Sequence, residues 1–109
     1  MKHERIELAR SIELTEGTSL QGEIVATFDD IVEVFGKPHG GDGCKTDVEW
    51  ELLFEDGTVA TIYNWKNGYA YLGTSEGTPC EKIKTWHVGG RTTAARAAVA
   101  STLGIYRNQ

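Results

Sequence analysis

The chain has 109 residues with 39% hydrophobic and 25% charged positions, which predicts one ordered globular domain over residues 1–109. Its 16 acidic residues outnumber its 11 basic ones, and the net charge of -5 argues against a protein that holds duplex nucleic acid on a broad basic face. No window approaches the roughly 18 apolar residues of a membrane span, so we expect a cytoplasmic protein without a membrane partner.

The first predicted element is a strand within residues 4–14, where apolar and polar residues alternate with a period of two. Arg10 falls on the apolar side of this strand, and a guanidinium there needs a partner. The partner is either a carboxylate in an ion pair or an anionic ligand. A second strand is predicted over residues 20–26.

A helix is predicted next, over residues 28–35, because apolar side chains recur there at helical spacing. Thr27 is its predicted N-cap, with Asp30 three residues later. Gly36 and then Pro38 end the helix. A glycine-rich loop over residues 36–46 follows.

The strongest strand pattern covers residues 48–54, which we expect to bury Trp50 in the core and to expose an acidic face. Asp56-Gly57 predicts a hairpin turn into a central strand over residues 58–66 that is covered on both faces. The acidic side chains of the expected exposed face are Asp47, Glu49, Glu51 and Glu55.

Asn67-Gly68 predicts another turn, leading to a short strand over residues 69–72. A last strand over residues 82–88 and a last helix from Thr92 or Thr93 to Leu103, ended by Gly104, complete the pattern. The predicted fold class is therefore α+β, with a mainly antiparallel sheet of five to six strands and two helices.

The segment TWHVGGRTTAAR, residues 85–96, has two interpretations. Glycines before a helix allow an anion to approach unpaired N–H groups, and the guanidinium and hydroxyls of Arg91 and Thr92 add ligands for a phosphate. The same residues also make an ordinary joint, in which Gly89 and Gly90 form a turn, Thr92 or Thr93 caps the helix and Arg91 is solvated. The segment has neither GxGxxG nor GxxxxGK[ST], so the choice stays open.

Three tryptophans and four tyrosines exceed what a core of this size readily hides, so we expect some at a pocket or an interface. His39, Cys44, Cys80 and His87 lack the close spacings of zinc sites, and no hydrolase motif is present. We therefore predict no metal, no cofactor and no catalytic activity. The alanine-rich last helix buries little area by itself, which predicts a homo-oligomer.

The run DGCKTDVEWELLFEDGTVATIYNWKNG, followed by WHVGG, resembles stretches of small phage and prophage proteins. Over residues 4–104, the size, the sheet followed by a C-terminal helix and the placing of Arg10 and Arg91 are similar to the Thoeris anti-defence family of phage signal sponges. This resemblance implies a cytoplasmic host–virus inhibitor that sequesters a cyclic nucleotide signal between subunits, with the arginines on phosphate or ribose and aromatic rings stacked on the base. The predicted ligand site is Arg10, Tyr63, Trp65, Trp86, His87, Gly89, Gly90, Arg91 and Thr92.

The alternative is an inhibitor of the anti-CRISPR type, which docks on a host defence protein. Its acidic strand face would then meet a basic groove built for nucleic acid.

Overall fold

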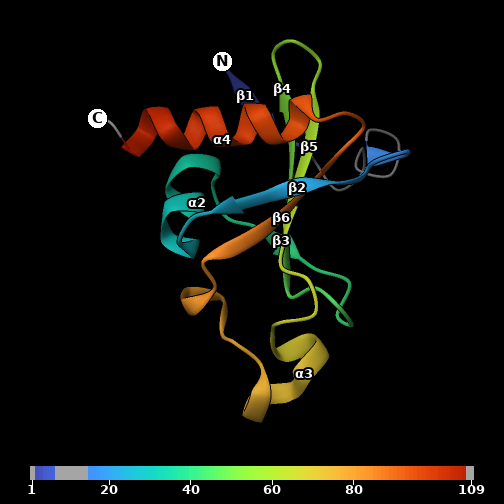
Figure 1. The fold of residues 1–109 in the computed structure, drawn as a ribbon, viewed down its shortest axis with the longest axis vertical. Coiled ribbons are helices and arrows are strands. Elements are labelled where there is room, and N and C mark those ends of the chain that lie inside the picture. Colours follow the sequence, from blue (N-terminus) through green and yellow to red (C-terminus); the bar gives the residue numbers. More distant parts are fainter. Residues whose placement is uncertain (1, 7–14, 108–109) are drawn as a thin grey trace.

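The computed structural model describes residues 2–6 and 15–107, which form an α+β fold with a six-stranded antiparallel sheet (Figure 1). This confirms the predicted fold class, except that the described residues contain three α-helices instead of two. In chain order the elements are β1 (His3–Arg5), β2 (Ser19–Val25), α2 (Phe28–Phe35), β3 (His39–Gly40), β4 (Val48–Phe54), β5 (Val59–Tyr63), α3 (Tyr69–Glu76), the 3₁₀ turn η1 (Cys80–Lys82), β6 (Thr85–Gly90) and α4 (Ala94–Arg107).

The sheet has the strand order β1-β4-β5-β6-β2, and β3 pairs with β4. The β4–β5 hairpin turns at Asp56-Gly57 as predicted: Gly57 has φ 91°, and Thr58 N donates to Asp56 Oδ1 at 2.9 Å. Strand β5 lies between β4 and β6, which confirms its predicted central position. The first strand is predicted within residues 4–14, and the structure describes only its beginning, as part of β1. Arg10 lies outside the described residues.

One face of the sheet carries the hydrophobic core, and α2 and α4 cover it (Figure 1). The rings of Trp50 and Trp86 meet edge to face there, with centroids 5.4 Å apart. Each indole N–H is satisfied by a backbone carbonyl: Trp50 donates to Gly36 O at 2.8 Å and Trp86 to Ala26 O at 3.0 Å. Trp50 is thus a core residue, as predicted.

Helix α2 begins and ends where the sequence predicts. Thr27 has an extended backbone, and its side chain accepts a hydrogen bond from Asp30 N at 3.1 Å. Gly36 follows the last turn with φ 88°, and its N–H donates to Val32 O. Both ends are determined by neighbouring residues, which explains the agreement.

The predicted short strand over residues 69–72 is wrong, because these residues form the first turn of α3, at the end of the molecule opposite the β4–β5 hairpin tip (Figure 1). Asp47 lies far away in sequence but accepts a hydrogen bond from Ala70 N at 2.8 Å, and so caps α3 from outside the helix. Asn64 is fully buried and donates to the other oxygen of Asp47 at 2.7 Å. The chain does bend at Asn67-Gly68 as predicted, but these contacts between distant segments make the following residues helical.

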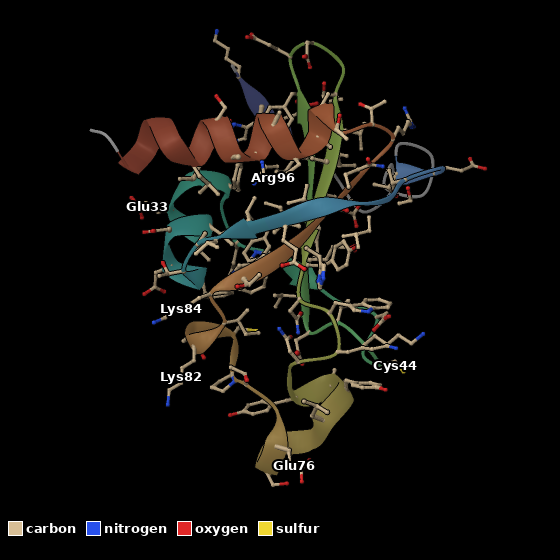
Figure 2. The ribbon with its side chains drawn as sticks, viewed as in Figure 1. Glu33, Cys44, Glu76, Lys82, Lys84 and Arg96 are labelled. Atoms are coloured by element: carbon tan, nitrogen blue, oxygen red, sulfur yellow. The ribbon has the colours of Figure 1, made fainter. Side chains whose placement is uncertain are left out.

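Helix α4 continues through Gly104, so the predicted end of the last helix is also wrong. The helix packs on β2, β5 and β6. Arg96, labelled in Figure 2, reaches from α4 to β2, where its Nε donates to Glu23 O at 3.0 Å. None of the described helices is long and apolar enough to cross a membrane.

Candidate functional site

Gly89 and Gly90 belong to β6 and do not form the predicted turn before the last helix. They pair with Leu20 and Ser19 of β2 on one side and with β5 on the other. Their peptide groups are therefore part of the sheet, which leaves them unsuited to the predicted phosphate cradle. The joint itself is made by Thr92, whose Oγ1 accepts from Ala94 N at 3.2 Å.

The two glycines are required because neighbours approach both faces of the sheet closely. A Cβ at Gly90 would lie 2.3 Å from Ala95 Cβ, on the face covered by α4. A Cβ at Gly89 would lie 2.5 Å from Thr61 Oγ1, on the opposite face. Gly90 thus allows α4 to pack on the sheet, whereas Gly89 keeps a hollow open on the other face.

The remaining predicted site residues fall into separate places. Trp86 is fully buried in the core, so the prediction that it contacts a ligand is wrong. Arg91 and Thr92 line a different cavity of about 240 Å³ beside the β4–β5 hairpin, and Arg91 Nε donates to Glu16 O at 3.3 Å. Arg10 lies outside the described residues.

Three of the predicted residues, Tyr63, Trp65 and Gly89, come together in one cavity of about 270 Å³ on the sheet face opposite the core. His87 stands beside it, with its ring stacked on Tyr63 at 5.8 Å and its Nε2 3.5 Å from Glu23 Oε1. We call this hollow the sheet-face cavity; its full lining is Thr15, Thr18, Ser19, Asp42, Thr46, Glu49, Thr61, Tyr63, Trp65 and Gly89.

Two carboxyl groups lie together at the sheet-face cavity. Glu49 lines it, and Glu51, two residues along the same face of β4, is only 7% exposed. Burial raises the pKa of Glu49 to about 7, and the charge and hydrogen bond of Glu51 and the charge of Asp42 raise it further. The prediction that both glutamates form an exposed acidic face is wrong, because the residues around the cavity cover this side of β4.

Asp42 has a structural role at the edge of the cavity. Its Oδ1 accepts hydrogen bonds from the N–H groups of Cys44, Lys45 and Thr46 at 2.8–3.0 Å, which closes the loop before β4. These bonds lower the pKa of Asp42 to about 2, so it stays ionised. Its charge therefore adds to the negative potential around Glu49.

The rim of the cavity is aromatic and cationic. The Trp65 side chain is 40% exposed, and its ring meets that of Tyr63 edge to face at 6.1 Å. The ammonium groups of Lys45 and Lys66 lie 5.5 and 5.7 Å from the centre of the Trp65 ring. Burial, followed by the charge of Glu49, raises the pKa of the Tyr63 hydroxyl.

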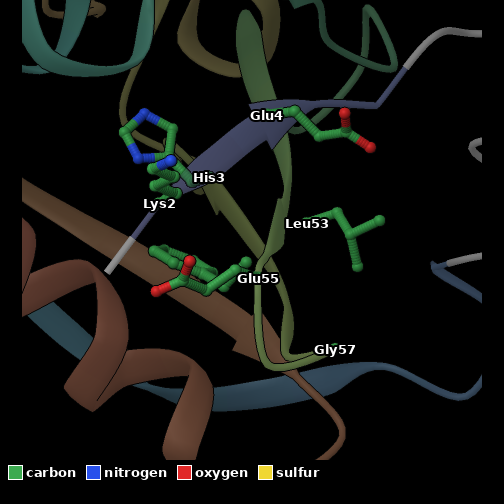
Figure 3. A pocket seen from close by; sticks show the side chains of 7 residues that line it. Lys2, His3, Glu4, Leu53, Glu55 and Gly57 are labelled. Atoms are coloured by element: carbon green, nitrogen blue, oxygen red, sulfur yellow. The ribbon is translucent and has the colours of Figure 1, made fainter.

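A larger hollow, of about 350 Å³, lies between β1 and the end of the β4–β5 hairpin (Figure 3). Its lining contains Lys2, His3, Glu4 and Glu55 and none of the predicted site residues. The sheet-face cavity is the better candidate because it combines buried polar groups with two aromatic rings.

Metal ligation and thiol chemistry find little support in the described part of the chain. It contains no group of three or more His, Cys, Asp or Glu side chains that could hold a metal ion. Cys44 is exposed and Cys80 half-buried, and both are free thiols.

The threonine and serine hydroxyls of the cavity and the role of Glu49 in it were not predicted from the sequence. These residues come from three separate segments, 15–19, 46–49 and 61, and no motif links them. Comparison of the chain with family models, curated proteins and solved structures found no match.

Proposed function

We propose that this protein is a non-catalytic binding protein that sequesters a small nucleotide, as a phage inhibitor of a nucleotide-signalled host defence would. The observation that carries the proposal is the sheet-face cavity, where hydrogen-bonding side chains meet the exposed ring of Trp65. A base can stack on Trp65 or Tyr63 while its polar edge faces the hydroxyl and carboxyl groups.

The charges around the cavity determine how a nucleotide would lie. Asp42 and the Glu49–Glu51 pair repel a phosphate from the interior. Lys45 and Lys66 at the rim offer the cations that a phosphate needs. We therefore propose that the base enters the cavity and the phosphate stays at the lysines, in place of the predicted Gly89-Gly90-Arg91 cradle.

Calorimetry with mononucleotides, cyclic nucleotides and cyclic ADP-ribose isomers tests this proposal. We expect at least one of them to bind, and Trp65→Ala to weaken binding by about 1–3 kcal/mol, the usual contribution of one stacked base. Val25→Ala is the matched control, because Val25 is an exposed residue of β2 outside the cavity. If folded protein binds none of these compounds, the proposal is wrong, whereas chemical conversion of a bound nucleotide would contradict the non-catalytic role.

Docking on a host defence protein is the second candidate, and the structure favours a different surface for it. With Glu51 buried, the predicted acidic face is reduced, whereas Tyr69, Tyr71 and Leu72 of α3 are exposed by 40–47%. Aromatic side chains of this kind are enriched at protein interfaces. Tyr69→Ala with Leu72→Ala should then abolish co-purification of a host protein and leave nucleotide binding unchanged; Tyr71 is kept because Lys66 Nζ lies 5.5 Å from the centre of its ring.

Homo-oligomerisation stays a prediction. Helix α4 presents the small residues Ala94, Ala97 and Ser101 on its exposed side, where a second copy could approach closely. Light scattering at high protein concentration would show a mass above that of one chain, and a pure monomer would contradict the prediction.

A further inference from the structure

The hydrogen-bonding groups of the sheet-face cavity are unequally available to a ligand. Asp42 Oδ1 already accepts three backbone N–H groups, and Thr46 Oγ1 accepts from Asp42 N at 2.7 Å. Ser19 Oγ accepts from Gln21 Nε2 at 3.3 Å. Of the two carboxyl groups that line the cavity, that of Asp42 is exposed and held by its own loop, so the half-buried carboxyl group of Glu49 is the one that a ligand inside the cavity would meet.

The Glu49–Glu51 pair has no compensating cation among the described residues. Every charge found to act on Glu49 is a carboxylate, from Glu51 or Asp42. Glu51 Oε2 is buried and has no hydrogen-bond partner in the part of the chain that the structure describes. A buried acceptor without a donor has a free-energy cost, and Glu49, the member of the pair that lines the cavity, is where a ligand that brings N–H groups would supply a donor to the pair.

The surroundings of the pair indicate the shape of that ligand. Thr61 lies opposite Glu51 in the sheet and Tyr63 opposite Glu49, so the pair faces side chains that line the cavity. The neighbouring Trp65 ring favours a flat group. Metal binding lacks support here, since no described cluster of His, Cys, Asp and Glu can hold an ion.

We infer, on the basis of the proposed function, that the sheet-face cavity selects nucleobases with an exocyclic amino group, which donates to the Glu49 carboxyl. Cytosine, adenine and guanine each carry such a donor, whereas uracil and hypoxanthine present a carbonyl or a hydrogen atom at the corresponding position. A carbonyl oxygen would face the carboxyl pair acceptor to acceptor. The cavity then distinguishes one nucleobase from another by the group on one edge of the base.

Paired ligands that differ only at this position provide the test. Calorimetry at about pH 8, above the pKa of about 7 of Glu49 so that its carboxyl group is ionised, compares CMP with UMP and GMP with IMP, on the wild type, on Glu49→Gln and on Glu55→Gln. We expect the amino-bearing member of at least one pair to bind about 10- to 100-fold more tightly to the wild type, as for a hydrogen bond to a charged group. Glu49→Gln should reduce this preference about tenfold, and the exposed control Glu55→Gln should retain it.

The outcomes separate this inference from the proposed function. Equal binding of both members of each pair, or a preference that persists in Glu49→Gln, overturns the inference and leaves nucleotide binding intact. No binding of any nucleotide overturns both. Tighter binding of agmatine than of CMP also overturns the inference, because the carboxyl pair would then recognise an aliphatic cation. Glu49→Gln removes a repelled charge, so we expect the variant to fold, which circular dichroism checks.

Discussion

Replacing either glycine of β6 by alanine should have consequences that differ between the two faces of the sheet. In Gly90→Ala the new Cβ collides with Ala95 Cβ, far inside the 3.5–4.0 Å of an ordinary carbon contact, and also lies 3.2 Å from Val59 O, a tight contact. Ala95 is buried, so α4 itself must move. We expect a loss of about 2–3 kcal/mol in the free energy of unfolding, the upper range for an overpacked core.

In Gly89→Ala the close neighbour is the hydroxyl of Thr61, which can rotate, and the next contacts are at 3.4 and 3.5 Å. Alanine also lowers the conformational entropy of the unfolded chain, which offsets about 0.5–1 kcal/mol of the loss in stability. We expect a net loss of about 1 kcal/mol or less, together with weaker nucleotide binding, because the methyl group occupies the floor of the cavity.

Thermal unfolding followed by circular dichroism measures both effects. The Tm should fall by roughly 10 °C or more for Gly90→Ala and by less than about 5 °C for Gly89→Ala. Adding Thr61→Ala to Gly89→Ala removes the contact and should restore stability. An equal or larger loss in Gly89→Ala than in Gly90→Ala would refute the assignment of the two glycines to opposite faces.

Three further predictions concern stability and pH. Asn64→Ala removes a buried side chain that accepts from two N–H groups and donates to Asp47 and Asn67, so urea unfolding should show a loss of about 3 kcal/mol; a loss below about 1 kcal/mol would contradict this. The pKa of Glu49 rises from 4.5 to about 7 on folding, so its contribution to stability is present below pH 4.5 and lost as the pH rises to 7. Relative to the wild type, the free energy of unfolding of Glu49→Gln should therefore rise by about 1–2 kcal/mol between pH 5 and pH 8 in thermal melts, a figure reduced for partial solvent exposure. A difference between the two proteins that does not change with pH would contradict the raised pKa of Glu49. Thr27→Ala should cost about 1 kcal/mol through the lost α2 cap, whereas Thr27→Ser should retain stability.

The elements that the sequence predicts correctly are those with local causes. Thr27, Asp30 and Gly36 lie within nine residues of one another and determine α2 by themselves. The Asp56-Gly57 turn and the alternating pattern around Trp50 likewise determine the hairpin and the face of β4 that enters the core. No information from distant parts of the chain is needed for these elements.

The errors occur where a distant contact decides the structure. Residues 69–72 have aromatic residues typical of a strand, but Asp47 caps Ala70 and turns the segment into α3. A glycine such as Gly104 is typical of a helix end, yet Leu103 is buried against the core and α4 continues past Gly104. A weak local preference changes neither outcome, because burial and hydrogen bonds have larger energies than helix propensity.

The candidate site could not be predicted from local sequence either, because distant contacts decide its structure as well. Glycines followed by an arginine and two threonines suit an anion chemically, but the ladder partners of Gly89 and Gly90 already occupy that backbone. Alternation alone placed Glu49 and Glu51 on one face of β4, whereas only the packing of other segments around that face shows that they are covered. Because these carboxylates lack a cation among the described residues and the lysines stand outside at Trp65, the site has a negative interior and a positive rim. A molecule with an amino-bearing ring at one end and a phosphate at the other matches both, and either end alone would satisfy only half of the site.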